Sequence, residues 1–220
     1  MNTQIIACRT VERELTQCIQ NTGVDYPILW VESGLHNTPK KLNRAVQALI
    51  DEAEADRLLL AMGFCGNSLV GLESKGRTLI LPRADDCISL LLGSNENRAA
   101  IARENAAYFL TEGWLSGERN LWKEHLHAVE KYGRDQAMEL ARMLYSHYRT
   151  LALLDTGTAD MTALLDGTEI IAQTLSLEQK IVPASLSWLE NLLTGPWHSD
   201  RFLTVPPGGK IELSHMLDRP

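Results

Sequence analysis

Four residues that bind soft metals well follow apolar, strand-like runs in this sequence. Cys8, Cys65 and Cys87 come where three such runs end, and His36 follows another. Zinc prefers thiolate and imidazole ligands, and a catalytic zinc commonly takes three protein ligands and keeps one position open. The residue types therefore predict a zinc site with His36, Cys65 and Cys87 as ligands and Cys8 as an optional fourth.

The spacing of these residues leaves other interpretations open. The sequence has no paired C-x-x-C motif of the zinc-finger kind, and a lone histidine can simply bind a loop carbonyl. Cysteine is among the most buried residue types, so each cysteine can also be a core residue. Cys18, at helical spacing within residues 11–19, is interpreted in that way. An iron–sulfur cluster held by the other three cysteines is the less favoured metal centre.

Other polar residues behind apolar runs are candidates for catalysis or substrate binding. Asp86 and Glu112 are the candidate general bases, although Asp86 also suits a helix N-cap. Arg83 can grip a carboxylate or phosphate with two hydrogen bonds, or it can form a structural ion pair with Asp85 or Asp86. The candidate substrate-binding residues are Arg83, Trp114, Asp155 and Thr156.

The elements that must position these residues alternate between apolar, β-branched runs and segments of helical periodicity. This alternation is typical of a doubly wound α/β fold, in which helices flank a mostly parallel sheet. The predicted strands are residues 5–8, 27–31, 58–62, 78–81, 108–110, 150–154, 180–183 and 202–205. Because such sheets bind ligands outside the carboxyl ends of their strands, we expect one rim to collect all the candidate residues.

The domain organisation is expected to be simple. No internal repeat, low-complexity segment or glycine- and serine-rich linker divides the 220 residues, so a single α/β domain over residues 1–220 is the first expectation. The alternation of strand-like and helical segments is interrupted near residues 113–118, and this interruption can also mark a junction between two small α/β lobes.

Composition and charge restrict the partners and the compartment. A net charge of −7 without any Lys/Arg-rich run argues against a nucleic-acid partner. No stretch approaches the roughly 18 to 20 apolar residues of a spanning helix, and no signal-peptide pattern is present. These features predict a cytoplasmic protein with no membrane partner, in which thiols stay reduced. No P-loop or G-x-S-x-G motif occurs.

Five blocks of the sequence carry a resemblance to a known family. The blocks "IIACRTVEREL", "LHNTPKKL", "MGFCGNSLVGL", "LPRADDCISLLLGS" and "YFLTEGW" are similar, in this order, to the prokaryotic family called domain of unknown function 1638. The resemblance spans about residues 5–115 and is weaker beyond. The family pattern has its cysteines and histidine at the positions of Cys8, His36, Cys65 and Cys87. The resemblance also implies an association with corrinoid-dependent methyl metabolism.

These observations lead to one first hypothesis and two alternatives. The first is a zinc-dependent protein that acts on a small molecule, by methyl transfer to or from a thiol or a corrinoid, with a corrinoid protein as a partner. One alternative is a carrier or accessory protein that holds a metal or corrinoid without catalysis. The other is metal-assisted hydrolysis or elimination, with Asp86 or Glu112 as the base.

Overall fold

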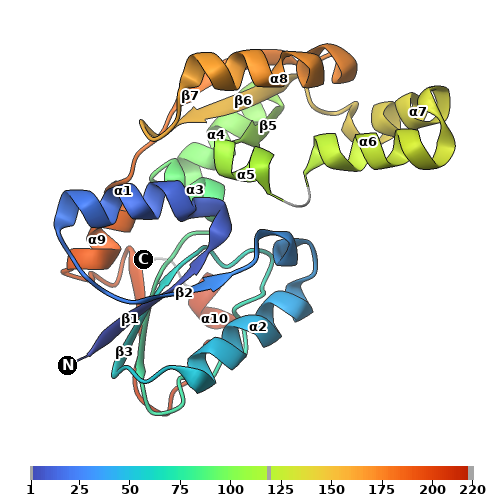
Figure 1. The fold of residues 1–220 in the computed structure, drawn as a ribbon. Coiled ribbons are helices and arrows are strands. Elements are labelled where there is room, and N and C mark those ends of the chain that lie inside the picture. Colours follow the sequence, from blue (N-terminus) through green and yellow to red (C-terminus); the bar gives the residue numbers. More distant parts are fainter. Residues whose placement is uncertain (1, 118–119, 218–220) are drawn as a thin grey trace. The chain divides into compact units, whose positions relative to one another are not determined.

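The chain folds into two compact α/β units. A computed structural model describes residues 2–117 and 120–217, apart from the side chains of residues 36 and 37. The first unit consists of Met1–Asn95 and Ser185–Pro220, and the second consists of Glu96–Ala184. Figure 1 shows both units, coloured along the sequence.

The first unit contains a five-stranded sheet in the order β2-β1-β3-β4-β8. Its strands are β1 (Thr3–Cys8), β2 (Ile28–Val31), β3 (Arg57–Ala61), β4 (Thr78–Pro82) and β8 (Phe202–Val205). The first four strands are parallel, and β8 pairs with β4 in the antiparallel direction, so the sheet is mixed. The order β2-β1-β3-β4 is that of a doubly wound sheet.

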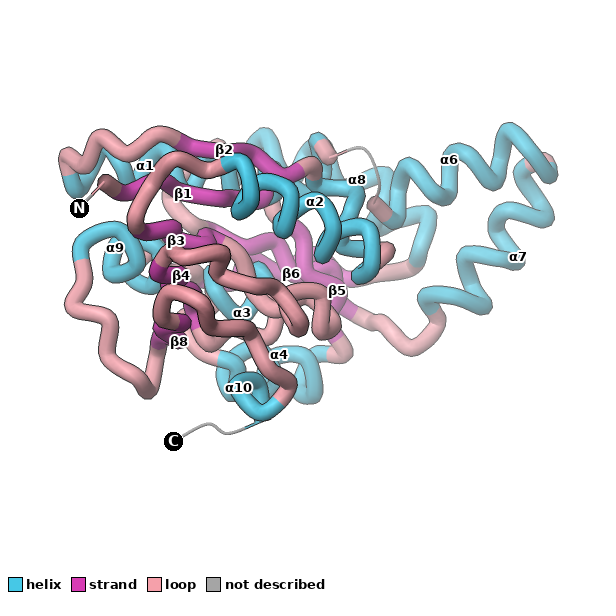
Figure 2. The backbone as a smooth tube through the Cα atoms, turned by 90° about the horizontal axis from the view of Figure 1, so that it is seen from below, coloured by secondary structure: helices cyan, strands magenta, loops and turns pink. Residues whose placement is uncertain are grey.

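Helices cover both faces of this sheet. The helical segments of the first unit are η1 (Arg9–Val11), α1 (Glu12–Thr22), η2 (Ser33–Asn37), α2 (Pro39–Glu52), α3 (Cys87–Leu91), α9 (Ser187–Thr194) and α10 (Ser214–Leu217). Helices α1 and α9 pack together on one face, and α2 lies on the other. Figure 2 shows these helices and strands from below, coloured by secondary structure.

The core of the first unit explains why its strands are continuously apolar. Leu58, Leu59 and Leu60 of β3 are fully buried, as expected for a central strand with helices on both faces. Each of these side chains contributes about 1.5–3 kcal/mol to folding through burial. This rigid centre holds the loops that follow β1 and β3.

The second unit contains an all-parallel sheet in the order β5-β6-β7. Its strands are β5 (Ala107–Leu110), β6 (Thr150–Asp155) and β7 (Glu178–Pro183), and its helices are α4 (Asn95–Asn105), α5 (Glu112–Ser116), α6 (Leu121–Tyr132), α7 (Arg134–Tyr145) and α8 (Met161–Leu175). Helix α8 packs on the sheet, and α6 and α7 form a hairpin. Leu110, Leu151, Leu153, Leu164 and Ile171 form the centre of its core.

The observed elements agree with the predicted α/β class in detail. Each of the eight predicted strands is present, with ends that differ by at most a few residues. The expectation of one rim is wrong, because the strands belong to two sheets that have separate carboxyl edges. The chain passes between the units near residues 95–96 and 184–185, and residues 113–117 lie inside the second unit. Within the described residues, no helix is long and apolar enough to cross a membrane.

Candidate metal centre

All four predicted ligands belong to the first unit and follow its parallel strands. Cys8 is the last residue of β1, His36 lies in η2 behind β2, and Cys65 and Cys87 follow β3 and β4. Parallel strands bring these positions to one edge of the sheet. In the order β2-β1-β3-β4, the neighbours β1 and β3 are the point where successive connections run in opposite directions, which is where such folds bind ligands.

Cys65 and Cys87 bring their sulfur atoms together. The two Sγ atoms lie 4.0 Å apart, although the residues are 22 positions apart in the chain. Two thiolates on one tetrahedral zinc, each at a Zn–S distance of about 2.3 Å, would lie about 3.8 Å apart. Both thiols are free, Cys87 being buried and Cys65 half-buried. Their separation is thus close to what a shared zinc ion requires.

Cys8 extends this pair to a row of three thiols. Its thiol lies near enough to Cys87 for the two to shift each other's pKa, and its Sγ atom lies 2.7 Å from the hydroxyl oxygen of Thr10. Cys87 therefore interacts with a thiol on each side. We call Cys8, Cys65 and Cys87 the thiol row.

Cys8 and Cys87 resist ionisation when no cation is present. The pKa of Cys8 lies far above its usual value because of the hydrogen bond with Cys87 and because of burial. The pKa of Cys87 is also raised well above its usual value, first by its hydrogen bond with Cys65 and further by burial. A bound cation reverses this preference, because metal ligation deprotonates cysteine. The thiols of Cys8 and Cys87 therefore stay neutral without a metal and can become thiolate ligands with one.

Backbone contacts hold the two loops of the thiol row side by side. The N–H of Phe64 donates to the carbonyl of Ala84 at 2.9 Å, and the N–H of Cys65 donates to Asp85 at 2.8 Å. Gly63 packs on Asp86 so closely that a Cβ atom at Gly63 would lie 2.6 Å from the Cα of Asp86. Glycine at this position is what allows the close approach.

Cys65 has a left-handed backbone, which is unusual for a residue with a side chain. Its φ angle is 45°, and Gly66 and Asn67 follow with φ angles of 64° and 66°. The buried Ser68 hydroxyl donates to the carbonyls of Phe64 and Cys65, both at 2.8 Å, and stabilises the turn. Residues in this region cost about 1–3 kcal/mol each and concentrate at functional sites.

Asp86 and Arg83, two further predicted site residues, hold the neighbouring structure together. The Asp86 carboxylate accepts a hydrogen bond from the N–H of Ser89 at 2.7 Å and caps α3. The Arg83 guanidinium donates to the carbonyls of Ser199 and His215, both at 2.7 Å. These bonds attach the loop after β4 to the C-terminal segment.

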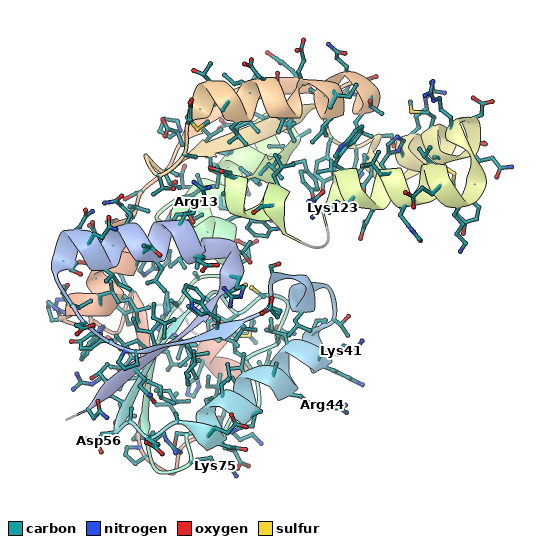
Figure 3. All side chains as sticks on the ribbon, viewed as in Figure 1. Arg13, Lys41, Arg44, Asp56, Lys75 and Lys123 are labelled. Carbon is teal, nitrogen blue, oxygen red and sulfur yellow. The ribbon has the colours of Figure 1, made fainter. Side chains whose placement is uncertain are left out.

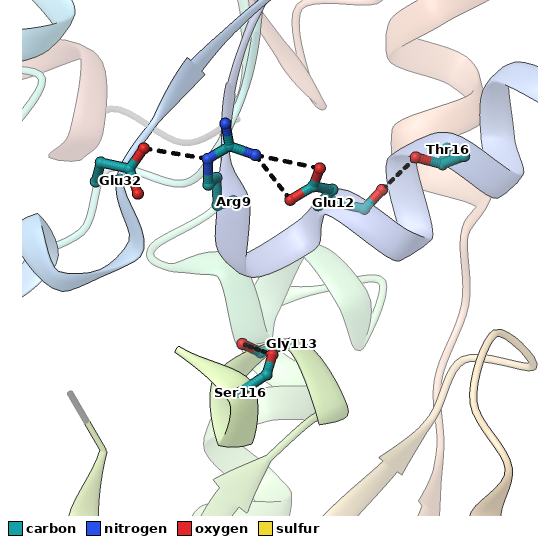
Figure 4. Close-up of polar contacts among 6 residues, drawn as sticks. All are labelled: Arg9, Glu12, Thr16, Glu32, Gly113 and Ser116. Atoms are coloured by element: carbon teal, nitrogen blue, oxygen red, sulfur yellow. Dashed lines mark hydrogen bonds and ion pairs between the residues drawn. The ribbon is translucent and has the colours of Figure 1, made fainter. Parts of the chain in front are cut away.

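An ion-pair cluster joins the ends of β1 and β2 beside Cys8. Arg9 donates to Glu32 through Nε at 3.1 Å and to Glu12 through Nη1, as Figure 4 shows. Its guanidinium also lies 5.4 Å from the ring centroid of Trp30. The charged groups are largely exposed, so we assign them a small contribution to stability.

The predicted ligand His36 has a described backbone but a side chain outside the described residues. Its backbone lies in η2, at the same edge of the sheet as the thiol row. Among the described side chains, no group of three or more His, Cys, Asp or Glu residues is arranged to hold a metal ion. A bound ion therefore requires the thiols to adjust around it, or a ligand from outside the described side chains.

The other predicted site residues follow β5 and β6 of the second unit. Glu112 and Trp114 are in α5, whose N-cap is Thr111, and Trp114 packs against the core of that unit. Asp155 accepts a hydrogen bond from the N–H of Gly157 at 3.0 Å, and the hydroxyls of Thr156 and Thr158 lie 2.8 Å apart. In Figure 4, Ser116 donates to the carbonyl of Gly113 in α5. Trp114, Asp155 and Thr156 thus make local contacts within their own unit.

Sequence reasoning missed several residues that support the thiol row. Thr10 contacts Cys8, Ser68 holds the turn of Cys65, and Asn95 accepts from the N–H of Asp85 at 2.7 Å while donating to the carbonyl of Arg83. Thr10 and Ser68 are only two and three residues from a candidate ligand, and that proximity was the available signal. No signal in the sequence pointed to Asn95, because its contacts depend on how the chain turns after α3.

Comparison with known proteins identifies a family. A family model described as "Protein of unknown function (DUF1638)" matches residues 30–193, which is most of the chain. This match confirms the resemblance inferred from the sequence blocks. It includes His36, Cys65 and Cys87, whereas Cys8 precedes it. No curated protein and no solved structure matches the chain.

Proposed function

The chain belongs to the DUF1638 family, a family of unknown function, and on that premise we propose that it binds zinc and acts on a small molecule. The ligands in this proposal are Cys65 and Cys87, together with His36 and the optional ligand Cys8. The observation that carries it is the 4.0 Å separation of the Cys65 and Cys87 sulfur atoms at the ligand-binding edge of a doubly wound sheet.

The proposed chemistry follows from the open position of a three-ligand zinc site. Zinc held by these ligands would lower the pKa of a substrate thiol bound to it and would so supply a thiolate. The resulting thiolate attacks a methyl group, forming a carbon–sulfur bond while the bond between methyl and its donor breaks and the donor keeps the electron pair. A corrinoid held by a partner protein is the methyl donor that we favour.

Metal analysis of protein purified without added metal tests the zinc site. We expect stoichiometric zinc and a colourless protein. Cys87→Ser should lose most of the zinc, because serine is a hard and poorly ionised ligand. Cys18→Ser is the matched control, since Cys18 is buried away from the thiol row, with its Sγ atom 3.9 Å from the carbonyl of Leu186.

Three outcomes would contradict the proposal. One is full zinc in both variants, and another is an apoprotein that takes up no zinc when it is supplied. The third is a brown protein with stoichiometric iron, which would replace zinc with an iron–sulfur cluster.

A carrier role is the second candidate, favoured by the contact of Cys8 with Cys87. With Cys8 and His36 both bound, zinc would have four protein ligands and no open position. Cobalt substitution separates the two roles, because the visible spectrum of tetrahedral cobalt changes when a ligand joins or leaves. A spectrum that shifts on addition of a small thiol supports catalysis. A spectrum that stays the same supports the carrier.

A further inference from the structure

A pocket adjoins the loop that carries Cys65. It has a volume of about 310 Å³ and lies between the start of α2 and the turn after β3. Residues Pro39, Lys40, Asn43 and Arg44 line it from α2, and Gly66, Asn67 and Val70 line it from the turn. Gly66, the residue directly after Cys65, faces Pro39, since a Cβ atom added at Gly66 would lie 3.9 Å from Cγ of Pro39. The pocket is therefore next to the proposed metal centre along the chain.

The pocket wall is held together by an asparagine. The side-chain amide of Asn43 donates to the carbonyls of Ser68 and Val70, at 2.8 and 3.0 Å. These two bonds fix the first turns of α2 to the turn after Cys65. A ligand that binds between α2 and this turn would thus meet a preformed surface.

The lining of the pocket is cationic in an acidic chain. Lys40 and Arg44 have no ion-pair or hydrogen-bond partner for their charged groups among the described residues, in contrast to Lys75, which pairs with Glu73 at 2.6 Å. Figure 3 labels Arg44 and the neighbouring Lys41 on α2. The chain as a whole carries a net charge of −7, so unpaired cations beside a pocket indicate attraction of an anion.

Backbone donors add to these charges. The N–H groups of Gly66 and Asn67 make no hydrogen bond to any group that the structure describes, which leaves out the side chains of residues 36 and 37. The flanking N–H groups of Cys65 and Ser68 are bonded to Asp85 and Phe64. Gly66 and Asn67 both have a positive φ angle. Successive free N–H groups in a turn, combined with an arginine fork and a lysine, are the donor set that phosphate oxygens accept.

We propose that this pocket binds the phosphate group of the small-molecule substrate and so directs the rest of the molecule toward Cys65. The phosphate site itself depends only on Lys40, Arg44, Gly66 and Asn67, whereas the identity of its ligand as the substrate rests on the proposed function. Arg83, the sequence-based candidate for anion binding, donates to the carbonyls of Ser199 and His215 instead. The substrate class is therefore a phosphorylated small molecule with a metal-binding group, such as a thiol, at its other end.

Titration of the full chain with inorganic phosphate tests the site. Amide resonances of Gly66 and Asn67 should shift and saturate. In the double variant Lys40→Gln, Arg44→Gln the affinity should fall about tenfold or more, because each lost partner is a charge-assisted bond. The control is Lys131→Gln, Arg134→Gln, which removes the same charge from the α6–α7 hairpin and should leave the affinity unchanged. Acetate at equal ionic strength should shift these amides much less.

Two results would overturn the phosphate site. One is the absence of saturable shifts at Gly66 and Asn67, and the other is an equal loss of affinity in the control variant. Zinc content, measured on the same samples, keeps the two proposals apart. A wild-type protein that binds phosphate but contains no zinc would refute the metal centre alone. A wild-type protein that contains zinc but does not bind phosphate would refute the phosphate site alone.

Discussion

Gly63 and Asp86 are in direct backbone contact: a Cβ atom placed on Gly63 would lie 2.5 Å from the carbonyl carbon of Asp86. Gly63 is two residues before Cys65, and Asp86 directly precedes Cys87. The close contact therefore sets the distance between the two loops whose thiols lie 4.0 Å apart.

Gly63→Ala should separate these loops. A methyl group cannot fit beside the Asp86 backbone without a shift, and overpacking of this kind costs about 1–3 kcal/mol of unfolding free energy. We expect lower stability in urea unfolding together with weaker zinc binding. Gly167→Ala is the control, because this helix α8 position has nothing within 4 Å of its added Cβ atom and should gain about 0.5–1 kcal/mol. An alanine at residue 63 that leaves both quantities unchanged would contradict the role of this contact.

Arg83→Lys should loosen the C-terminal segment without weakening phosphate binding. Lysine keeps the charge but cannot direct two fixed donors to the carbonyls of Ser199 and His215. We expect faster amide hydrogen exchange in residues 198–217 and unchanged phosphate affinity. Unchanged amide hydrogen exchange together with weaker phosphate binding would instead show that Arg83 binds the anion.

The fold was predictable because its information is local in the sequence. The apolar run of β3 and the helical spacing of Leu42, Val46 and Ile50 in α2 are each visible within a short window. The division into two sheets was not predictable in this way. It depends on which strands pair, and β8 joins β4 from more than a hundred residues away.

The candidate site was predictable only as far as strand order allows. Cys8, Cys65 and Cys87 could be brought to one edge because each follows a parallel strand. Trp114 and Asp155 resembled them in sequence, but their strands pair within the other sheet. The position of Lys40 in the lining of a pocket depends on how the turn after β3 packs against α2, for which the sequence carries no periodic signal.

Two substitutions separate the contribution of the capping oxygen of Asp86 from that of its charge. Asp86→Asn keeps an oxygen that accepts from the N–H of Ser89, so a capping role predicts a small change in stability. Asp86→Ala removes the acceptor and should cost about 0.5–2 kcal/mol. Urea unfolding of both variants makes the comparison. A loss in Asp86→Asn as large as in Asp86→Ala would show that the charge of Asp86, rather than its capping oxygen, is what the structure requires.

Cys18 should react much more slowly than Cys65 with an alkylating reagent. Burial raises the pKa of its thiol to about 12, so at pH 8 only about one thiol in ten thousand is ionised. Because this folded-state pKa is raised, burial of the neutral thiol stabilises the fold fully below a pH of about 9, and that stabilisation is lost as the pH rises through about 12.

Mass spectrometry after iodoacetamide treatment at pH 8 checks this order. Cys65, which is half-buried, should be modified first, and added zinc should slow its modification. Raising the pH toward 11 should accelerate the modification of Cys18. This acceleration should be far larger than any slowing of Cys18 modification by added zinc. Modification of Cys18 as fast as Cys65 in the native protein would contradict the burial described here.

Thr10→Val tests whether Cys8 belongs to the metal centre. The Thr10 hydroxyl lies 2.7 Å from the Cys8 sulfur and is buried, so it can donate to the thiolate that a metal ligand must become. Hydrogen bonds to metal ligands typically change metal affinity by about 10–100-fold, and valine removes the bond with little change in volume. We expect a loss of zinc affinity in this range, measured by competition with a chelator. Thr168→Val is the control, because its buried hydroxyl donates to the carbonyl of Leu164 in the second unit. Equal zinc affinity in the wild type and Thr10→Val, with Cys8→Ser also unchanged, would exclude Cys8 as a ligand and leave His36, Cys65 and Cys87 as the proposed set.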